Sequence, residues 1–135
     1  MKKFLLITAI AMLCLNAANA ETRNSEQVLI HHIDSLKALN LEEVLADYND
    51  ASVLVTADKT YVGKAQIREI FTNMLPMMAP LKDISVAREA LSSDVTRQTF
   101  HATLNGSNIE GEDIFVVRDG AILFQVILPP KPPAH

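Results

Sequence analysis

The chain has 135 residues, 49% of them hydrophobic and 21% charged, with a formal net charge of −4 at pH 7. This length and apolar content suit one globular domain, and no linker, repeat or low-complexity run divides the chain. The acidic balance and the lack of a Lys/Arg cluster exclude nucleic acid as the expected partner, because binding to phosphates needs a basic surface. A single cysteine cannot form an internal disulfide, so the core must hold the domain together.

Residues 1–20 have the composition of a secretory signal peptide. Lys2 and Lys3 supply a positively charged start, residues 4–15 an apolar run, and Ala18-Asn19-Ala20 a cleavage site of small residues. About twelve apolar residues are too few to span a bilayer as a stable helix. A retained membrane anchor is therefore the weaker interpretation.

Cleavage after Ala20 would give a mature chain that begins at Glu21. Cys14 leaves a lipoprotein alternative, although Leu13 stands where lipidation signals carry a small residue. The mature chain keeps ten basic and sixteen acidic residues, a net charge of −6. We expect it in the periplasm or outside the cell, without membrane attachment after cleavage.

A first helix is expected over residues 25–38. At 100° per residue, one apolar stripe is made by Leu29, Ile33 and Leu36. His32 lies at the edge of this stripe and His31 nearly opposite, so His32 should face the interior and His31 the solvent. Two rings placed in this way do not suit one metal ion, and no third ligand follows at a useful spacing. No metal or other cofactor is therefore expected.

Residues 38–75 show the clearest order of elements, which is helix, strand, tight turn, short strand, helix. Asn40 is a favourable N-cap, and Glu43 three residues later completes a capping box. Residues 52–56 are short and β-branched, as in a buried strand, and residues 61–62 form a brief return strand.

A second amphipathic helix is predicted after Gly63, with Pro76 expected to end it. Three methionines lie near its end: Met74, Met77 and Met78. Methionines at such positions fill gaps in a core, and they also suit adaptable binding surfaces. Both interpretations stay open from the sequence alone.

The rest of the chain has the pattern of four strands, expected at 84–90, 95–104, 112–118 and 121–128. Asn105-Gly106 and Asp119-Gly120 are strong two-residue hairpin turns. Alternation in the last strand places Ile122, Phe124, Val126 and Leu128 on one face and Leu123 and Ile127 on the other. A strand that is apolar on both faces needs helices on one side and a further partner on the other. The proline-rich residues 129–135 should form an extended tail.

Three segments carry a resemblance to the SnoaL-like branch of the nuclear transport factor 2-like superfamily. They are Leu-Glu-Glu-Val-Leu-Ala-Asp-Tyr-Asn-Asp-Ala-Ser-Val-Leu at 41–54, the helix start at 63–68, and the stretch 113–120. The resemblance covers residues 25–128. It implies an α+β fold in which a strongly curved antiparallel sheet wraps around about three helices as a cone. It implies a domain over 21–128 and a partner subunit against the sheet, most simply a homodimer through Leu123 and Ile127.

The open end of such a cone is the default ligand site. Lining residues expected from their inward direction are Tyr48, Val55, Tyr61, Phe71, Met74, Phe100, Phe115 and Phe124. Asp113 and His32 stand out among the inward residues, because a carboxyl group among aromatic side chains has a raised pKa and a neighbouring imidazole could exchange its proton. A structural role for each of them is the alternative.

The resemblance also implies roles for the two residues of this pair. Asp113 falls where ketosteroid isomerase-like members place a protonated acid that donates to an oxyanion, and His32 falls where they place a tyrosine. The general base of those enzymes would fall at or beside Val55, and valine cannot carry a proton. The chain therefore lacks the general base that the isomerase reaction requires.

Three functions remain from the sequence. The first is an exported domain that binds a small apolar or amphipathic molecule without transforming it. The second is an enzyme of the lyase, isomerase or cyclase type that uses His32 and Asp113 for proton transfer. The third is a protein-interaction module that uses its sheet face.

Overall fold

The computed structural model describes residues 22–130, so the predicted signal peptide and the last five residues lie outside the described part. Nine elements follow one another in the chain. They are α1 (Ser25–Lys37), α2 (Leu41–Ala46), β1 (Val53–Val55), β2 (Thr60–Val62), α3 (Gly63–Met78), β3 (Lys82–Ala90), β4 (Val95–Leu104), β5 (Ser107–Arg118) and β6 (Ala121–Leu128). The α+β class with three helices is confirmed.

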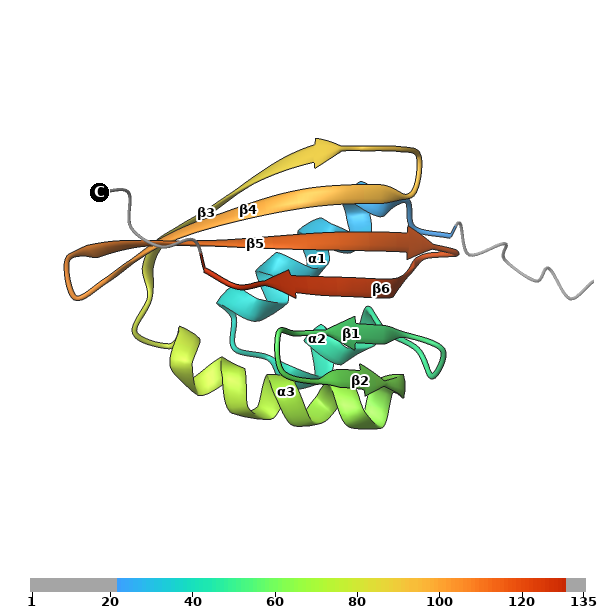
Figure 1. Cartoon of the computed structure of the whole chain (residues 1–135), viewed down its shortest axis with the longest axis horizontal. Helices are drawn as coiled ribbons and strands as arrows, with labels where there is room; N and C mark the ends of the chain where they lie inside the picture. Colours follow the sequence, from blue (N-terminus) through green and yellow to red (C-terminus); the bar gives the residue numbers. More distant parts are fainter. Residues whose placement is uncertain (1–21, 131–135) are drawn as a thin grey trace, which may run out of the picture.

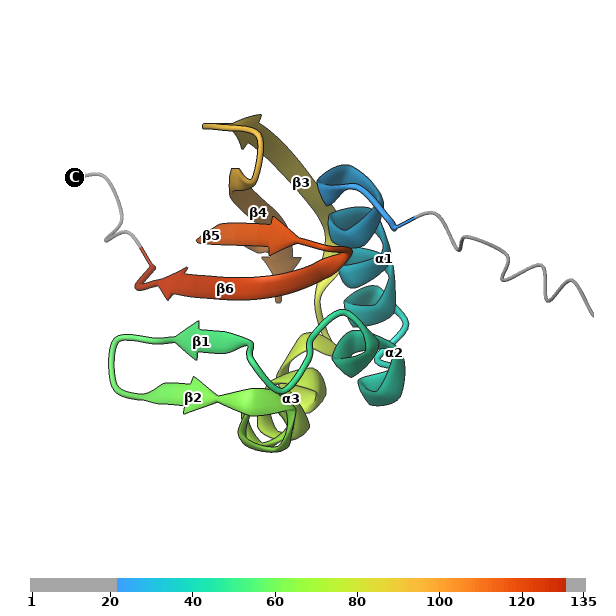
Figure 2. The ribbon, with the colours of Figure 1, turned by 90° about the vertical axis from the view of Figure 1, so that its right-hand side faces the viewer.

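The six strands form one curved, open sheet in the order β2-β1-β6-β5-β4-β3. Four of the five pairings are antiparallel, but β1 pairs with β6 in parallel, so the expected all-antiparallel sheet is wrong and the sheet is mixed. The helices gather on one side of this sheet, and the opposite face carries no helix (Figures 1 and 2). The interior of the cone lies between the helices and the concave face.

Local signals set the starts of the first two helices. The Asn24 side chain accepts from the Gln27 backbone N–H, and the Gln27 side chain accepts from the Asn24 N–H, which completes a capping box before α1. Asn40 caps α2 as predicted, with its side chain accepting from the Glu43 N–H. Glu43 does not return this bond, because its carboxylate contacts His31 instead.

The third helix differs from the prediction at its end. It continues through Pro76 to Met78 and stops before Pro80. Proline removes one hydrogen bond to the preceding turn and crowds that turn with its ring, but Pro76 lies only two residues from the helix end, and the last residues remain helical. Met74 and Met78 are thus placed on one packed helix, half-buried against the core, while Met77 is exposed.

A bulge in β6 overturns the predicted faces of the last strand. Val116 pairs with Phe124 and Val117 with Ile122, so Leu123 is one extra residue. Such a residue reverses the alternation of every later side chain. Phe124 is consequently exposed on the outer face, and Ile127 packs against the core.

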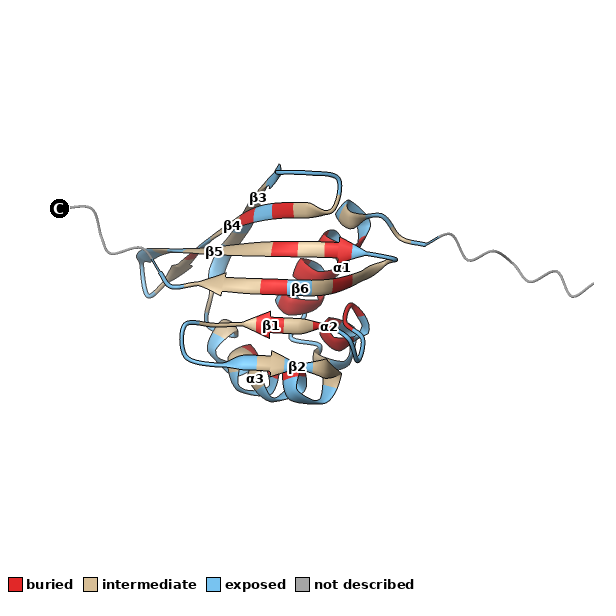
Figure 3. Ribbon diagram, turned by 45° about the vertical axis from the view of Figure 1, so that its right-hand side comes forward, coloured by how far each residue is buried: buried red, intermediate tan, exposed pale blue. Residues whose placement is uncertain are grey.

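The core lies between α1, α3 and the concave face of the sheet. It includes Val28, Leu29, Val44, Leu45, Leu54, Ile67, Phe71, Phe115 and Ile122, each at most 1% exposed. Figure 3 shows buried segments in the middle of the strands and on the helix sides that face them. Within residues 22–130, none of the helices has the length and apolar character that a membrane crossing requires.

Candidate functional site

A row of polar side chains crosses the concave face of the sheet. Arg88 of β3 lies opposite Gln98 of β4, Gln98 opposite Asp113 of β5, and Asp113 opposite Ile127 of β6. The Arg88 guanidinium is held by two other groups, because its Nε donates to Gln98 Oε1 (2.9 Å) and its Nη2 to the carbonyl of Leu29 (3.0 Å). Asp113 is therefore the member of the row that is left with a free carboxyl group.

Asp113 is half-buried, and its carboxyl group has no hydrogen bond or ion pair with any residue in 22–130. Burial, with a smaller effect from the charge of Glu112, raises its pKa to about 7. Two residues along the same face, Gly111 leaves open space, since an added Cβ would meet no atom within 4 Å. Phe100 lies opposite Gly111 and is half-buried against the core. Asp113 thus borders an apolar, partly uncovered area inside the cone.

His32 lies deep in the core at 1% exposure. Its ring meets three aromatic rings edge-on, those of Tyr48, Phe71 and Phe115, at centroid distances of 5.6, 5.8 and 5.8 Å. Burial lowers its pKa, which outweighs the opposite effect of Asp47, so the ring is neutral near pH 7. Its inward direction, predicted from the helical stripe, is confirmed.

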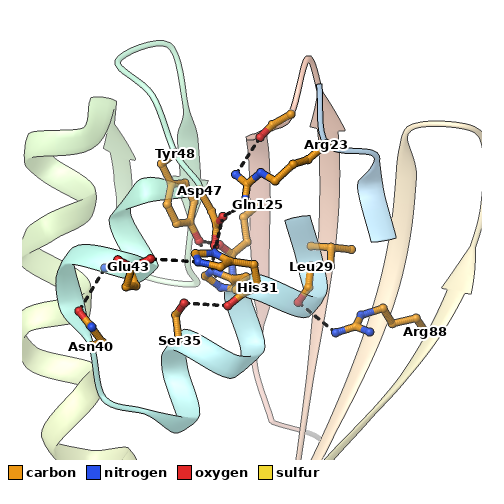
Figure 4. A network of polar contacts seen from close by, with 12 residues as sticks. Arg23, Leu29, His31, Ser35, Asn40, Glu43, Asp47, Tyr48, Arg88 and Gln125 are labelled. Carbon is orange, nitrogen blue, oxygen red and sulfur yellow. Dashed lines mark hydrogen bonds and ion pairs between the residues drawn. The ribbon is translucent and has the colours of Figure 1, made fainter. Parts of the chain in front are cut away.

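The carboxylate nearest to His32 belongs to Asp47, a residue that the sequence analysis did not single out. Asp47 follows the last turn of α2 and its side chain is completely buried. Its Oδ1 accepts from Arg23 Nη1 (2.9 Å), and His31 Nδ1 lies 2.8 Å from Oδ1 and 2.9 Å from Oδ2. The nearest nitrogen of His32, Nδ1, lies 3.7 Å from Oδ2. Figure 4 shows Arg23, His31 and Asp47 converging beside the first two helices.

Opposing effects decide the charge of Asp47. Burial favours the protonated carboxyl group, but the nearby His32 and the hydrogen bonds with His31 and Arg23 outweigh this effect and lower the pKa. His31 also lies 3.0 Å from Glu43 through Nε2, and the hydrogen bond to Asp47 raises the pKa of His31 against the effect of its burial. The site is therefore a buried carboxylate held by two cationic groups.

A weak sequence signal for Asp47 did exist. On a helical wheel Asp47 borders the apolar face made by Val44 and Tyr48, where a carboxylate is costly without a partner. The partners come from residues 16 and 24 positions earlier, and no short spacing reveals them. Only the packing of α1 beside α2 brings these groups together.

The Tyr48 hydroxyl contacts two polar side chains of the interior, those of His32 and Gln125. It donates to Gln125 Oε1 and lies 3.5 Å from His32 Nε2. Burial raises the Tyr48 pKa well above its ordinary value, and the charge of Asp113 adds to this effect. No hydrogen bond or ion pair joins His32 and Asp113 among residues 22–130.

The predicted lining residues fall into three groups. Tyr61, Met74 and Phe100 are half-buried against the core, as expected of a lining. Tyr48, Phe71 and Phe115 face inward but are at most 2% exposed, so they fill the core instead of bordering an open space. Val55 and Phe124 were placed wrongly, because Leu54 takes the inner position on β1 and the bulge turns Phe124 outward.

The surface of the described part is hollowed at the start of α1 and at the end of β6. One hollow of about 400 Å³ lies at the start of α1, with Arg23, Glu26, Arg118 and Asp119 among its lining residues. A smaller one of about 80 Å³ lies where β6 ends, lined by Gly111, Leu128 and Pro129 with Glu110 and Glu112. Residues 22–130 contain no group of three His, Cys, Asp or Glu side chains arranged to hold a metal ion.

Chemically, the interior can accept or release a proton in two places. The Asp113 carboxyl group exists in both protonation states near pH 7, so it can donate a hydrogen bond or accept one. The neutral imidazole of His32 beside the Tyr48 hydroxyl forms the second place. Neither place offers a nucleophile of the serine or cysteine type.

Neither a protein-family model nor a curated protein matches the sequence. Solved structures do match. A nuclear transport factor 2-like protein of unknown function from Cytophaga hutchinsonii is 13% identical, with 83% of this chain and 95% of that chain covered and a TM-score of 0.63. A ketosteroid isomerase-like protein from Erwinia carotovora atroseptica is 17% identical, with 85% and 99% covered and a TM-score of 0.64.

A putative SnoaL-like polyketide cyclase from Shewanella denitrificans is 15% identical, with 76% of this chain and 88% of that chain covered and a TM-score of 0.55. Identities this low show a common fold and carry no residue roles from those proteins to this chain. The geometry of the chain's own side chains must decide what the interior does.

Proposed function

We propose that this chain, which has the nuclear transport factor 2-like fold, binds a small amphipathic molecule inside its cone. The polar group of the ligand contacts the Asp113 carboxyl group, and its apolar part lies along the concave face beside Phe100 and Ile127. One observation carries this proposal. Asp113 points inward from β5 without any hydrogen-bond or ion partner in residues 22–130.

A polar group left in this state costs free energy in the folded protein, of the order of 1–3 kcal/mol when it is not hydrogen-bonded. Gln98 lies directly opposite, but its side chain bonds to Arg88 through Oε1 and makes no hydrogen bond with Asp113. A structural role for Asp113 would have given it a partner of this kind. The open space at Gly111 supplies room beside the carboxyl group, which is what a ligand requires.

Gly111 offers a sharp test. A leucine there fills the inner area without a clash, because the backbone is extended and nothing lies within 4 Å of the new Cβ. We expect the parent to bind the neutral dye Nile red, and Gly111→Leu to weaken binding by about tenfold or more.

Asp113→Asn tests the polar contact in the same assay. Ala87→Leu, on the exposed side of β3, is the matched control and should bind as the parent does.

Native mass spectrometry of protein purified from its own source gives the second measurement. A bound mass that is present in the parent and absent from Gly111→Leu would identify the natural ligand. Parent protein that carries no ligand and binds no dye, or Gly111→Leu protein that binds as well as the parent, would refute the proposal.

The outer face of the sheet is suited to binding another protein chain. The outer face carries two adjoining apolar rows, made by Val53, Phe124, Val116 and Val95 and by Val55, Val126 and Ile114. No helix covers this face (Figure 2), and Phe124 is 36% exposed. We propose that a second copy of the chain docks here, because a continuous and partly exposed apolar face of this kind usually marks an interface. This surface replaces the one predicted around Leu123 and Ile127.

Export is proposed from the sequence of residues 1–20, which carries the lysines, apolar run and small-residue site described above. The mature domain would then act in the periplasm or outside the cell. Chemistry of the lyase or isomerase type remains the alternative function. It is favoured by the Tyr48 hydroxyl, which lies 3.5 Å from His32 Nε2, and by the raised pKa of Asp113.

A further inference from the structure

We propose that the ligand of the cone is an amphipathic amine, whose ammonium group pairs with the Asp113 carboxylate while its apolar chain lies beside Phe100 and Ile127. This inference rests on the proposed function and deepens it, because it names the class of molecule that the same site takes. The competing class is a neutral molecule that accepts a hydrogen bond from a protonated Asp113. The two classes respond oppositely to pH.

Asp113 has no counter-ion among residues 22–130. The residues directly opposite it on the neighbouring strands, Gln98 of β4 and Ile127 of β6, carry no charge. Arg88 stands in the same row but two strands away, which is about 10 Å between backbones at the usual strand spacing. Its guanidinium donates to Gln98 and to the carbonyl of Leu29, and it makes no ion pair with Asp113. The described part of the chain therefore supplies no cation to this carboxyl group.

The titratable groups that neighbouring elements turn toward this part of the interior are neutral near pH 7. Burial, and then the charge of Asp113, raises the pKa of the Tyr48 hydroxyl well above its ordinary value. Burial lowers the pKa of His32 on α1, so its imidazole is neutral. Glu112, the preceding residue of β5, is negative, and its charge adds to the effect of burial on the pKa of Asp113. A cationic ligand is the electrostatic complement of these surroundings.

The rim of the sheet beside Asp113 is acidic. A hollow of about 80 Å³ opens there, lined by Glu110, Gly111, Glu112, Leu128 and Pro129. Gly111 lies two residues from Asp113 on the same face of β5, so the hollow adjoins the open space beside the carboxyl group. The ion pairs at this rim are Arg97 with Glu89 and Glu112, and His101 with Glu110. Three carboxylates thus face one arginine and one histidine, and this excess of negative charge raises the local concentration of cations.

An ammonium ion supplies the partner that the site lacks. Its charge favours the ionised form of Asp113, and a partly buried carboxylate is far less costly when it is paired and hydrogen-bonded. Binding of the cation below pH 7 therefore releases to solvent the proton that Asp113 holds in the free protein. A neutral acceptor such as a ketone needs that proton, so its affinity should fall as the pH rises. The direction of the pH dependence distinguishes the two ligand classes.

Three probes with an eight-carbon chain make this comparison. Octylamine stays protonated near neutral pH, whereas 1-octanol and 2-octanone are uncharged. We expect calorimetric titration to show octylamine binding at least about tenfold more tightly than either uncharged probe at about pH 8. With the pKa of Asp113 at about 7, its ionised fraction rises about tenfold between about pH 6 and about pH 8, so the affinity for octylamine should rise by the same factor.

Asp113→Asn should abolish both the preference for octylamine and its pH dependence. Asp58→Asn removes the same formal charge from an exposed turn and should leave both as in the parent. Nile red binding without a preference for octylamine, or an affinity for octylamine that falls as the pH rises, would overturn this inference and leave the proposed function intact. Failure of Nile red and of all three probes would instead refute the proposed function.

Discussion

Nδ1 of His31 lies 2.8 Å from Oδ1 of Asp47, and this contact joins a partly solvent-exposed imidazole to a carboxylate with no exposed surface. Arg23 binds the same oxygen and donates to the carbonyl of Gly120 as well. The three contacts tie the first residues of the described chain, the first two helices and the last hairpin together. Stability should therefore depend on the charges of His31 and Asp47.

The first prediction concerns pH. The pKa of His31 is raised, so its stabilising effect is complete below its ordinary value of 6.5 and is lost as the pH rises through the raised value. The pKa of Asp47 is lowered, so its effect is complete above its ordinary value of 3.8 and is lost as the pH falls through the lowered value. The pair should stabilise the fold most between pH 3.8 and 6.5.

Urea unfolding of His31→Gln measures this. We expect a loss of about 1 kcal/mol near the middle of that window, because the ring is partly exposed and solvent screens the pair. The loss should shrink in alkaline solution, where the parent imidazole is neutral. A loss that does not change with pH would show that the His31 charge contributes nothing.

The second prediction concerns Asp113. Its folded pKa of about 7 lies above the ordinary value of 3.8, so ionisation in the folded protein is disfavoured and stability falls as the pH rises through about 7. Asp113→Asn removes this dependence, and the variant should be more stable than the parent in mildly alkaline solution by the order of 2 kcal/mol. Asp58→Asn, in an exposed turn, is the control. An Asp113→Asn protein that is less stable at every pH would instead indicate a structural role.

The third prediction concerns the buried network. Asp47→Ala leaves the Arg23 and His31 cations without their carboxylate and should cost about 3 kcal/mol of unfolding free energy. The replacement of the exposed Glu43 by alanine removes one contact of His31 at the surface and should cost less than about 1 kcal/mol. Equal costs for the two variants would contradict the central position of Asp47.

The fourth prediction concerns assembly. Phe124→Lys places a charge in the middle of the outer apolar rows and should convert a dimer into a monomer in sedimentation experiments. Ser85→Lys on the exposed edge strand should leave the dimer intact. Parent protein that sediments as a monomer at tens of micromolar would remove the outer face from consideration as a self-association surface.

The fifth prediction concerns processing. N-terminal sequencing of exported protein should find Glu21 as the first residue, after the Ala18-Asn19-Ala20 site. Retention of Met1 would contradict cleavage, and a chain that begins with a modified Cys14 would establish the lipoprotein alternative.

Much of the fold was predictable because its signals are local. The Asn40 cap, the hairpin turns at Asn105-Gly106 and Asp119-Gly120, and the alternation along residues 95–104 depend on neighbours only a few positions apart. The order of these elements also indicated the nuclear transport factor 2-like fold, which the structural comparisons confirm. The inward direction of His32 and Asp113 followed from periodicity alone.

Only the tertiary structure shows which face of β6 turns inward, because the periodicity of the sequence does not predict a bulge. A single extra residue at Leu123 exchanged the two faces of β6, so Phe124 and Ile127 took the opposite of their predicted positions. Alternation assumes an unbroken ladder, and the sequence of residues 121–128 is apolar in either register. Packing against the helices selected one of them.

The same limit applies to the site. The sequence indicated two inward titratable residues and paired them with each other, because they were the unusual ones. The structure gives His32 the carboxylate of Asp47 and leaves Asp113 without a partner in residues 22–130. Residue type and local period determine which side chains turn inward. Which of them meet is decided by the crossing of helices and strands that are far apart in the chain, where the cost of burying an unpaired charge selects the partners.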